Sequence, residues 1–117
     1  MLEFFNEKII FYKTNEDRNL FLLNIDGVDV GVVRLDEELL TDNSFYINCV
    51  EIYYNYRNRG YGHILMREIE RYAKQNNKKC LFLKVYSENT DAIKLYKDVG
   101  FETISNGDFI IEMEKNL

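Results

Sequence analysis

The chain has no proline, only two cysteines and a single histidine among its 117 residues. Without proline, repeats or low-complexity tracts there is no segment that reads as a linker, so residues 1–117 are predicted to form one domain. Cysteine and histidine are too scarce for a structural zinc site, and no metal site is predicted. No apolar run approaches the roughly 20 residues that span a bilayer, and the N-terminus lacks the regions of a signal peptide. We therefore expect a cytoplasmic protein that does not contact a membrane.

Positive charge is also in short supply. The chain has 15 Lys and Arg against 20 Asp and Glu, which gives a formal net charge of -5. A nucleic-acid-binding domain normally carries a basic surplus, so no nucleic-acid partner is expected. An acidic protein is compatible with a cationic acceptor such as an amine. The apolar fraction of 46% and the charged fraction of 30% are those of a globular protein rather than a disordered one.

The two cysteines, Cys49 and Cys80, each lie inside an apolar, strand-like run. A small buried thiol is the usual interpretation of such a position. A cysteine nucleophile would need a histidine partner, and the only candidate is His63, which follows a glycine-rich segment. The sequence therefore favours structural cysteines.

That glycine-rich segment, Arg57–Gly62 (Arg-Asn-Arg-Gly-Tyr-Gly), stands between a strand-like and a helix-like run. Glycine permits a tight turn and the close approach of a ligand, and the first turn of a helix presents unpaired N–H groups. The helix dipole and two arginines add positive potential, so the segment predicts a phosphate-binding loop. A turn that only closes the fold remains an alternative. The P-loop and the Rossmann fingerprint do not match, because no Gly-Lys-Ser/Thr ending and no third glycine follow.

The spacing Arg57-x-x-Gly60-x-Gly62 resembles the acyl-CoA pyrophosphate loop of the GNAT superfamily of N-acetyltransferases. A second element of that superfamily is matched downstream, at the expected distance, by Asn89, Ala92, Tyr96 and Gly100-Phe101. The resemblance extends from about residue 20 to the end of the chain and is strongest over residues 45–101. It implies an α/β (α+β) fold: a mixed, mostly antiparallel central sheet with a splayed strand pair and flanking helices.

Local patterns predict the same order of elements. Alternating apolar residues predict strands over residues 8–13, 20–25, 28–35, 45–52, 80–86, 101–105 and 108–114. Asp26-Gly27 and Asn106-Gly107 are predicted hairpin turns. Apolar residues at helical spacing predict one helix from Tyr61 to about residue 76 and a second that ends at Gly100, with the glycine in the left-handed conformation.

One departure from the superfamily concerns the acceptor side. Relatives usually carry two helices between the first and second strands, and those helices form much of the acceptor wall. Here only a short polar segment, residues 14–19, separates the first two predicted strands. The acceptor pocket is therefore expected to be shallower or to be completed by a second subunit, which leaves a homodimer open.

The resemblance also implies the chemistry: acetyl transfer from acetyl-CoA to a primary amine by direct attack in a ternary complex. Tyr96 matches the tyrosine that protonates the leaving thiolate. Glu51 is a candidate base, directly or through water, although Asn48 occupies the position where many relatives place a water-organising Glu. Asn89 matches a residue that contacts pantetheine or caps a helix. The other implied cofactor contacts are Ile52, Tyr53, Tyr54, Arg57, Asn58, Arg59, Gly60, Tyr61, Gly62 and His63.

The leading hypothesis is thus a small acetyl-CoA-dependent N-acetyltransferase that acts on a small-molecule or peptide amine. A first alternative is a CoA-binding or protein-interaction module that keeps the cofactor site without efficient transfer. The shortened N-terminal region and the missing Glu favour this alternative, whereas Tyr96 opposes it. A second alternative is a nucleotide-phosphate binder. The acceptor is not specified by the sequence.

Overall fold

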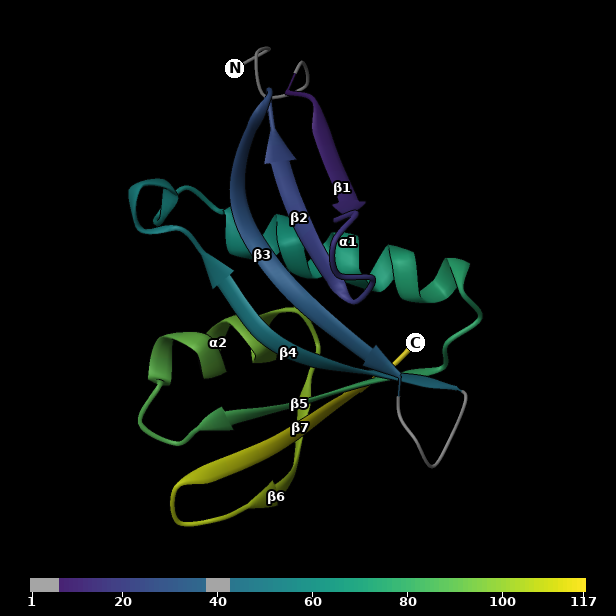
Figure 1. Cartoon of the computed structure of the whole chain (residues 1–117). Coiled ribbons are helices and arrows are strands. Elements are labelled where there is room, and N and C mark those ends of the chain that lie inside the picture. The colour runs from purple at the N-terminus through teal and green to yellow at the C-terminus, as the bar shows by residue number, and fades with distance from the viewer. Residues whose placement is uncertain (1–6, 38–42) are drawn as a thin grey trace.

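The structure is a computed structural model and describes residues 7–37 and 43–117. A seven-stranded sheet has the order β1-β2-β3-β4-β5-β7-β6, and β4 and β5 are its parallel neighbours (Figure 1). The strands are β1 (Ile9–Lys13), β2 (Leu20–Ile25), β3 (Val28–Glu37), β4 (Ser44–Ile52), β5 (Cys80–Tyr86), β6 (Glu102–Asn106) and β7 (Ile110–Asn116). The helices are a short 3₁₀ helix (Tyr54–Tyr56), α1 (Tyr61–Gln75) and α2 (Thr90–Asp98). This arrangement confirms the predicted mixed, mostly antiparallel sheet with flanking helices.

The strands form where apolar residues alternate, and their buried sides all face the helices. In β5, Leu81, Leu83 and Val85 are buried while the intervening residues are more exposed. In α1, Leu65, Ile69 and Ala73 are fully buried, which is the stripe expected at helical spacing. Burial of such side chains stabilises the fold by roughly 1.5–3 kcal/mol each.

Aromatic side chains attach α1 to the N-terminal half of the sheet. The ring of Tyr72 on α1 lies 4.8 Å from that of Phe21 on β2 and 5.9 Å from that of Phe45 on β4. Phe11 on β1 stacks on Phe21 at 5.1 Å. Helix α1 therefore crosses the β1–β4 half of the sheet, as Figure 1 shows.

Helix α2 packs on the same face, next to α1. Residues of α1, β5 and β7 line one small cavity together with Val99 and Phe101, which follow α2. In the described part of the chain both α-helices thus cover one face of the sheet. The opposite face has no helix over it among these residues.

A bulge in β4 separates β4 from β5. Arg34 of β3 lies opposite Asn48 and Val32 lies opposite Glu51, so two residues of β4, Cys49 and Val50, face one residue of β3. Cys49 adopts a φ of 56°, which is rare for a residue with a side chain. Beyond the bulge β4 no longer pairs with β5: their ladder is confined to Ser44–Ile47 and Cys80–Leu83. The predicted splayed strand pair is thereby confirmed.

The predicted element boundaries differ from the observed ones by two residues or fewer. Asp26 and Gly27 form the first hairpin turn with φ of 51° and 89°, as a type I′ turn requires. Gly100 has a φ of 102° and ends the second helix as predicted. The last hairpin turns two residues later than predicted, at Asp108-Phe109, where the N–H of Gly107 donates to the carbonyl of Ile110 at 3.0 Å.

Two further expectations concern the cysteines and the N-terminal region. The prediction of two buried thiols is wrong for Cys49, which is exposed at the bulge, while Cys80 is half-buried. Within residues 7–37, β1 leads into β2 through residues 14–19 without a helix, as the sequence indicated. None of the helices in the described ranges is long and apolar enough to cross a membrane. Residues 7–37 and 43–117 also contain no cluster of metal-ligating side chains.

Candidate functional site

The glycine-rich loop forms a cradle of backbone N–H groups at the start of α1. Asn58 and Gly60 both have left-handed backbone conformations, with φ of 63° and 81°, and Gly60 is the residue that caps α1. In the described part of the chain no acceptor pairs with the N–H groups from Asn58 to His63. Unpaired donors at a helix N-terminus favour an anion, because the helix dipole is positive there.

The two glycines of the loop have different roles. A Cβ on Gly60 would meet nothing within 4 Å, so glycine is needed there for its backbone conformation. A Cβ on Gly62 would lie 3.2 Å from the side chain of Leu95 on α2. Gly62 therefore allows α1 and α2 to approach each other. Both glycines also line the loop cavity, so their role in the close approach of a ligand stays a prediction.

A cavity of about 390 Å³ opens at this loop. Its walls come from the end of β4, the loop itself, the first turn of α1 and one side of α2. The lining residues are Ile52, Tyr56, Arg57, Asn58, Gly60, Tyr61, Gly62, His63, Asp91, Ala92 and Leu95. Most of the predicted cofactor-binding residues are thus brought together at one place.

The charged groups of the loop are held by neighbours. Arg57 donates from Nε to the carbonyl oxygen of Ile52 at 2.8 Å, and its Nη2 lies 3.5 Å from a carboxylate oxygen of Glu51. The Arg59 guanidinium lies 5.7 Å from the ring centre of Tyr56. His63 Nε2 is 3.7 Å from a carboxylate oxygen of Asp98, near the end of α2. The two arginines add positive charge beside the N–H cradle.

A second cavity, of about 430 Å³, lies where β4 and β5 diverge. It is lined by Tyr46, Cys49, Val50, Lys84, Val85, Tyr86, Asn89, Tyr96 and Ile110. The two cavities flank α2, since Ala92 and Leu95 line the first whereas Asn89 and Tyr96 line the second. Helix α2 therefore contributes residues to both cavities.

Tyr96 is the most deeply buried polar side chain at this cavity. Only 8% of the residue is exposed, and its hydroxyl has no hydrogen-bond partner among the residues that the structure describes. Burial raises the pKa of Tyr96, so the phenol keeps its proton at neutral pH. The Tyr96 oxygen is not among the fully enclosed polar atoms without a partner in the described residues, so its hydroxyl is open to the cavity and can donate to a ligand there.

Asn89 lies at the N-terminus of α2, and its side chain accepts a hydrogen bond from the Ala92 N–H at 3.3 Å. This is the capping contact that the sequence predicted. It orders the turn that leads from β5 into the helix that carries Tyr96. Asn89 also lines the cavity with Tyr96.

The two candidate bases, Glu51 and Asn48, lie outside the cavity that Tyr96 lines. Glu51 is exposed and turned toward Arg57, and neither Glu51 nor Asn48 lines the cavity with Tyr96. Asn48 instead accepts a contact from the Cys49 thiol at 3.3 Å. Tyr53 is fixed by its N–H, which donates to the Val30 carbonyl at 2.8 Å.

Other predicted contacts lie outside both cavities. Tyr54 is 80% exposed beside the loop, where its ring lies 5.6 Å from the Arg57 guanidinium. Tyr53, Tyr54 and Arg59 border the loop cavity without lining it.

Sequence reasoning missed the side chains that the bulge brings to the cavity. Cys49 and Val50 line it because β4 is irregular there. Cysteine and valine are not residues that prefer a positive φ, so the sequence carries no signal for the bulge at this position. Lys84 and Tyr86 are exposed residues of β5 that alternate with its buried ones. That alternation is the signal in the sequence that could have identified them as surface residues near the cavity.

Comparison with known proteins supports the same interpretation. Residues 2–101 match the Acetyltransferase (GNAT) family. An uncharacterized N-acetyltransferase of Methanocaldococcus jannaschii is 31% identical over 94 residues, which cover 77% of this chain and 41% of the relative. The chain thus spans about two fifths of the length of that relative.

Solved structures show the same fold at low sequence identity. IAA acetyltransferase from Bacillus cereus has a TM-score of 0.77 at 15% identity, over 95% of this chain and 99% of that one. The PaiA N-acetyltransferase from Thermoplasma acidophilum, solved in complex with coenzyme A, has a TM-score of 0.74 at 19% identity, over 84% and 60% of the two chains. From the family match and the shared motifs, the chain belongs to the GNAT family of acetyltransferases.

Proposed function

We propose that this protein transfers an acetyl group from acetyl-CoA to a primary amine by direct attack in a ternary complex, with residues 1–117 acting as one acetyltransferase domain. The observation that carries the proposal is Tyr96, a buried residue whose hydroxyl has no hydrogen-bond partner among the described residues and which lines the cavity where β4 and β5 splay. The PaiA relative was solved with coenzyme A, which supports the choice of cofactor. Bound acetyl-CoA supplies an activated acetyl group as a thioester.

The residues fit this cofactor in three places. The N–H groups of Asn58–His63, with Arg57 and Arg59, suit a pyrophosphate. The edge of β4 beyond Ile47 no longer pairs with β5, so its backbone groups can pair with the amides of a pantetheine arm. N–H groups near Ile52 would serve as donors to the acyl oxygen. Tyr53 and Tyr54 continue this wall toward the loop.

Tyr96 acts as the general acid in this proposal. Because burial raises the pKa of its hydroxyl, Tyr96 remains protonated over the range in which a thiolate, with a reference pKa of about 8.5, must be protonated on leaving. Asn89 holds the first turn of α2 and thereby the side of the cavity at which the sulfur would lie. Generation of the neutral amine is the remaining requirement.

An amine with a pKa of about 10.4 requires roughly 4–5 kcal/mol to be deprotonated at neutral pH. Glu51 is the carboxylate that β4 carries. Because its side chain is turned toward Arg57, we assign it the role of a base that acts through water rather than by direct contact. Asn48 would orient such a water. Both lie on the strand that leads to the loop.

A second candidate function has one specific observation in its favour. None of the described residues that line the cavity with Tyr96 is a carboxylate. A CoA-binding or protein-interaction module with weak transfer activity would need no base there. This alternative predicts CoA binding without amine-dependent thiol release.

Thermal unfolding in the presence of acetyl-CoA, CoA, ATP or NAD tests the cofactor directly. A ligand at 100 times its Kd should stabilise the protein by roughly 2.7 kcal/mol. Stabilisation by acetyl-CoA and CoA alone is the expected result, and it is followed by a screen of polyamines, amino acids and lysine peptides for thiol release from acetyl-CoA. Stabilisation by ATP or NAD instead would indicate a nucleotide-phosphate site. If neither acetyl-CoA nor CoA stabilises the chain, both the transferase and the CoA-module hypotheses fail.

A further inference from the structure

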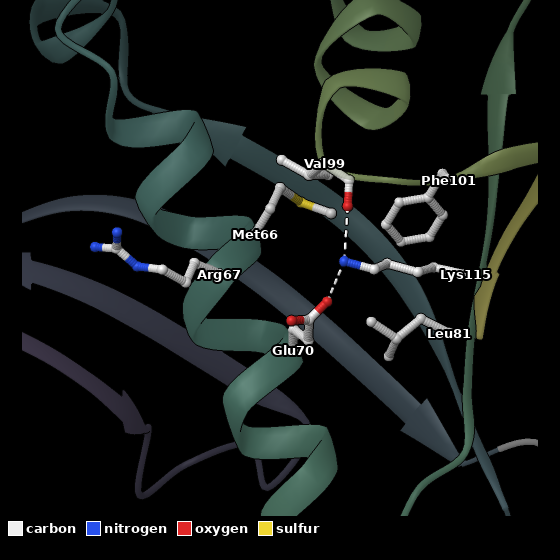
Figure 2. Close-up of a pocket in the computed structure, with 7 residues that line it drawn as sticks. All are labelled: Met66, Arg67, Glu70, Leu81, Val99, Phe101 and Lys115. Carbon is white, nitrogen blue, oxygen red and sulfur yellow. Dashed lines mark hydrogen bonds and ion pairs between the residues drawn. The ribbon is translucent and has the colours of Figure 1, made fainter. Parts of the chain in front are cut away.

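Lys115 on β7 connects its own strand to α1 and to the end of α2 on the helical face (Figure 2). Its ammonium donates a hydrogen bond to the carbonyl oxygen of Val99, the residue that caps α2, at 2.7 Å. The same ammonium forms an ion pair with Glu70 of α1. These groups lie at one wall of a cavity of about 190 Å³, which is lined by Met66, Arg67, Glu70, Leu81, Val99, Phe101 and Lys115.

The end of α2 leaves the Val99 carbonyl free of backbone donors, so that it can accept from Lys115. The N–H of Phe101 donates to the carbonyl of Tyr96 at 2.9 Å, and the N–H of Gly100 donates to that of Lys97 at 3.1 Å. This is the Schellman arrangement, which satisfies the carbonyls of the last turn and requires a left-handed residue. The Val99 carbonyl remains, and it accepts from Lys115.

Gly100 also makes room for the lysine. A Cβ on Gly100 would lie 3.1 Å from Cε of Lys115 and 3.4 Å from its Nζ. The lysine stem therefore passes against the backbone of the helix end, where a side chain would displace it. Glycine at this position serves both the turn and the passage of Lys115.

The same helix end fixes Tyr96. The carbonyl of Tyr96 is the acceptor of the Phe101 N–H, and the rings of Tyr96 and Phe101 lie 6.0 Å apart. Val99, which Lys115 holds, follows Tyr96 by less than one turn of helix. A shift of the helix end would therefore move the Tyr96 side chain.

The ion pair anchors this end of α2 to α1. Glu70 lies on the helix whose first turn forms the N–H cradle, and α1 meets α2 again where Gly62 contacts Leu95. The Lys115 ammonium has two direct partners: Oε1 of Glu70 and the carbonyl oxygen of Val99. A second ammonium, that of Lys74 on α1, lies 3.5 Å from Oε2 of Glu70. An ammonium at the C-terminus of a helix is also favoured by the helix dipole.

We propose that Lys115 is a positioning residue for acyl transfer. By holding the C-terminus of α2 against α1, Lys115 fixes the Tyr96 hydroxyl at the sulfur position relative to the phosphate cradle. The inference rests on the proposed function, in which Tyr96 is the general acid. A residue that only stabilises the fold would not depend on Tyr96 for its effect.

A double-mutant cycle separates positioning from stability. Lys115→Met is measured alone and in combination with Tyr96→Phe, with Lys97→Met on the exposed side of α2 as the matched control. The assay is thiol release from acetyl-CoA with the most active amine of the screen. Lys115→Met should lower kcat about tenfold with little change in the KM for acetyl-CoA, which corresponds to about 1.4 kcal/mol. In the Tyr96→Phe background the same change should lower kcat by less than twofold.

Lys115→Arg keeps the charge and the donors, and it should recover most of the lost kcat if the hydrogen bond to Val99 is what matters. An equal loss in both Tyr96 backgrounds would overturn the proposal, and so would a folded Lys115→Met variant with normal kcat. If Lys115→Met does not fold, Lys115→Leu takes its place in the cycle, because it also removes the donor to the Val99 carbonyl while keeping an apolar side chain. Failure of the proposed function is distinct: Tyr96→Phe itself would then leave turnover unchanged.

A readout that needs no acceptor completes the test. The ¹³Cζ resonance of Tyr96 in tyrosine-labelled protein is assigned by its loss in Tyr96→Phe. Lys115→Met should move or broaden this resonance, whereas Lys97→Met should leave it in place. An unmoved Tyr96 resonance in folded Lys115→Met contradicts the proposal even if the protein has no measurable turnover.

Discussion

The two faces of the sheet differ in how firmly their functional groups are held. On the helical face the loop, α2 and the end of β7 are fixed by contacts from several elements: Gly62 against Leu95, Asn89 on Ala92, and Lys115 on Val99. On the opposite face the described residues have no helix, and apolar side chains such as Ile10, Tyr86 and Ile110 are exposed. The helical face, which carries the loop and Tyr96, is constrained, and the opposite face is open.

This difference explains why the cofactor is easier to infer than the acceptor. A phosphate cradle needs particular backbone conformations, and those require glycine or an equivalent residue at Asn58 and Gly60. An open sheet face forms from any strand sequence in which buried and exposed side chains alternate, and many sequences do this. Such a face therefore carries no residue pattern that identifies a ligand. The contrast leads to four predictions, ordered from the largest expected effect to the smallest.

The largest effect is expected on the constrained side, at Tyr96. Tyr96→Phe removes the hydroxyl and leaves the ring against Phe101 in place. Turnover should fall by roughly 10²–10⁴-fold, the usual contribution of a general acid, while CoA affinity changes little. Steady-state kinetics and CoA titration measure the two quantities.

The control for Tyr96→Phe is Tyr86→Phe, which removes a hydroxyl from the same cavity at a residue that is 65% exposed. Tyr86→Phe should retain nearly full turnover. Unchanged turnover in Tyr96→Phe would remove Tyr96 as the acid and favour the CoA-module alternative.

The second prediction uses the reactivity of the two thiols to test whether CoA occupies the gap between β4 and β5. Cys49 is exposed and lines the cavity at the splay, whereas burial, together with the Glu114 carboxylate, raises the pKa of the Cys80 thiol. Iodoacetamide should therefore alkylate Cys49 faster than Cys80. CoA at 100 times its Kd should slow alkylation of Cys49 by up to roughly hundredfold, as mass action requires if the complex is unreactive.

Peptide mass spectrometry follows both thiols in one sample, so Cys80 is the internal control. Its alkylation rate should be the same with and without CoA. Equal rates at Cys49 with and without CoA would mean that the cofactor does not occupy the gap between β4 and β5.

The third prediction compares alanine substitutions at two glycines that have similar backbone conformations but lie in different parts of the molecule. Gly60 and Gly27 have φ of 81° and 89°, and a Cβ on either would meet nothing within 4 Å. Alanine at either position should cost about 1–2 kcal/mol of folding stability, because the left-handed conformation is unfavourable for a residue with a Cβ. Gly60→Ala should also weaken CoA binding, by about tenfold for each 1.4 kcal/mol of lost interaction.

Gly27→Ala, in the β2–β3 hairpin, should leave CoA affinity unchanged. Calorimetric titration and thermal unfolding of the two variants measure affinity and stability separately. Equal loss of affinity in both variants would indicate a general loss of folded protein rather than a specific loop.

The sequence was sufficient for the parts that local chemistry determines. The turn pair Asp26-Gly27 and the stop at Gly100 were predicted because each depends on the conformations available to a few adjacent residues. The cap at Asn89 is one of the two roles that the family resemblance implied for this residue. The order and approximate bounds of the strands followed from alternation.

Contacts between distant residues could not be predicted in this way. The bulge at Cys49 depends on the pairing of β4 with β3, and Gly62 is selected by Leu95, which lies on another helix. In the sequence, Lys115 is indistinguishable from an ordinary exposed lysine of a strand. Its contacts with Val99 and Glu70 exist only in the folded structure. These are tertiary constraints without a local pattern.

The smallest predicted effect compares one ion pair from each face at low pH. Burial alone would raise the pKa of Glu70, but Lys115 and Lys74 outweigh it and lower the pKa below its ordinary value. The hydrogen bond from Arg34 likewise lowers the pKa of Asp17. A carboxyl with a lowered folded pKa contributes stability that is present above its unfolded pKa and is lost as pH falls through the folded value. For Glu70 the loss therefore begins near pH ~4.3, and for Asp17 near pH ~3.9.

Thermal melts of Glu70→Gln and Asp17→Asn between pH 7 and pH 3 test this difference. Glu70→Gln should be the more destabilising at pH 7, because it leaves the half-buried Lys115 ammonium with only the Val99 carbonyl. Asp17→Asn removes a more exposed pair, so its effect should be small and should nearly vanish in 1 M salt, where the Debye length is about 3 Å. For both variants the difference in Tm from the wild type should shrink as pH falls through the folded pKa of the carboxyl. If Asp17→Asn is the more destabilising and the less sensitive to salt, the helical face is not the more tightly held of the two, and the contrast between the two faces is wrong.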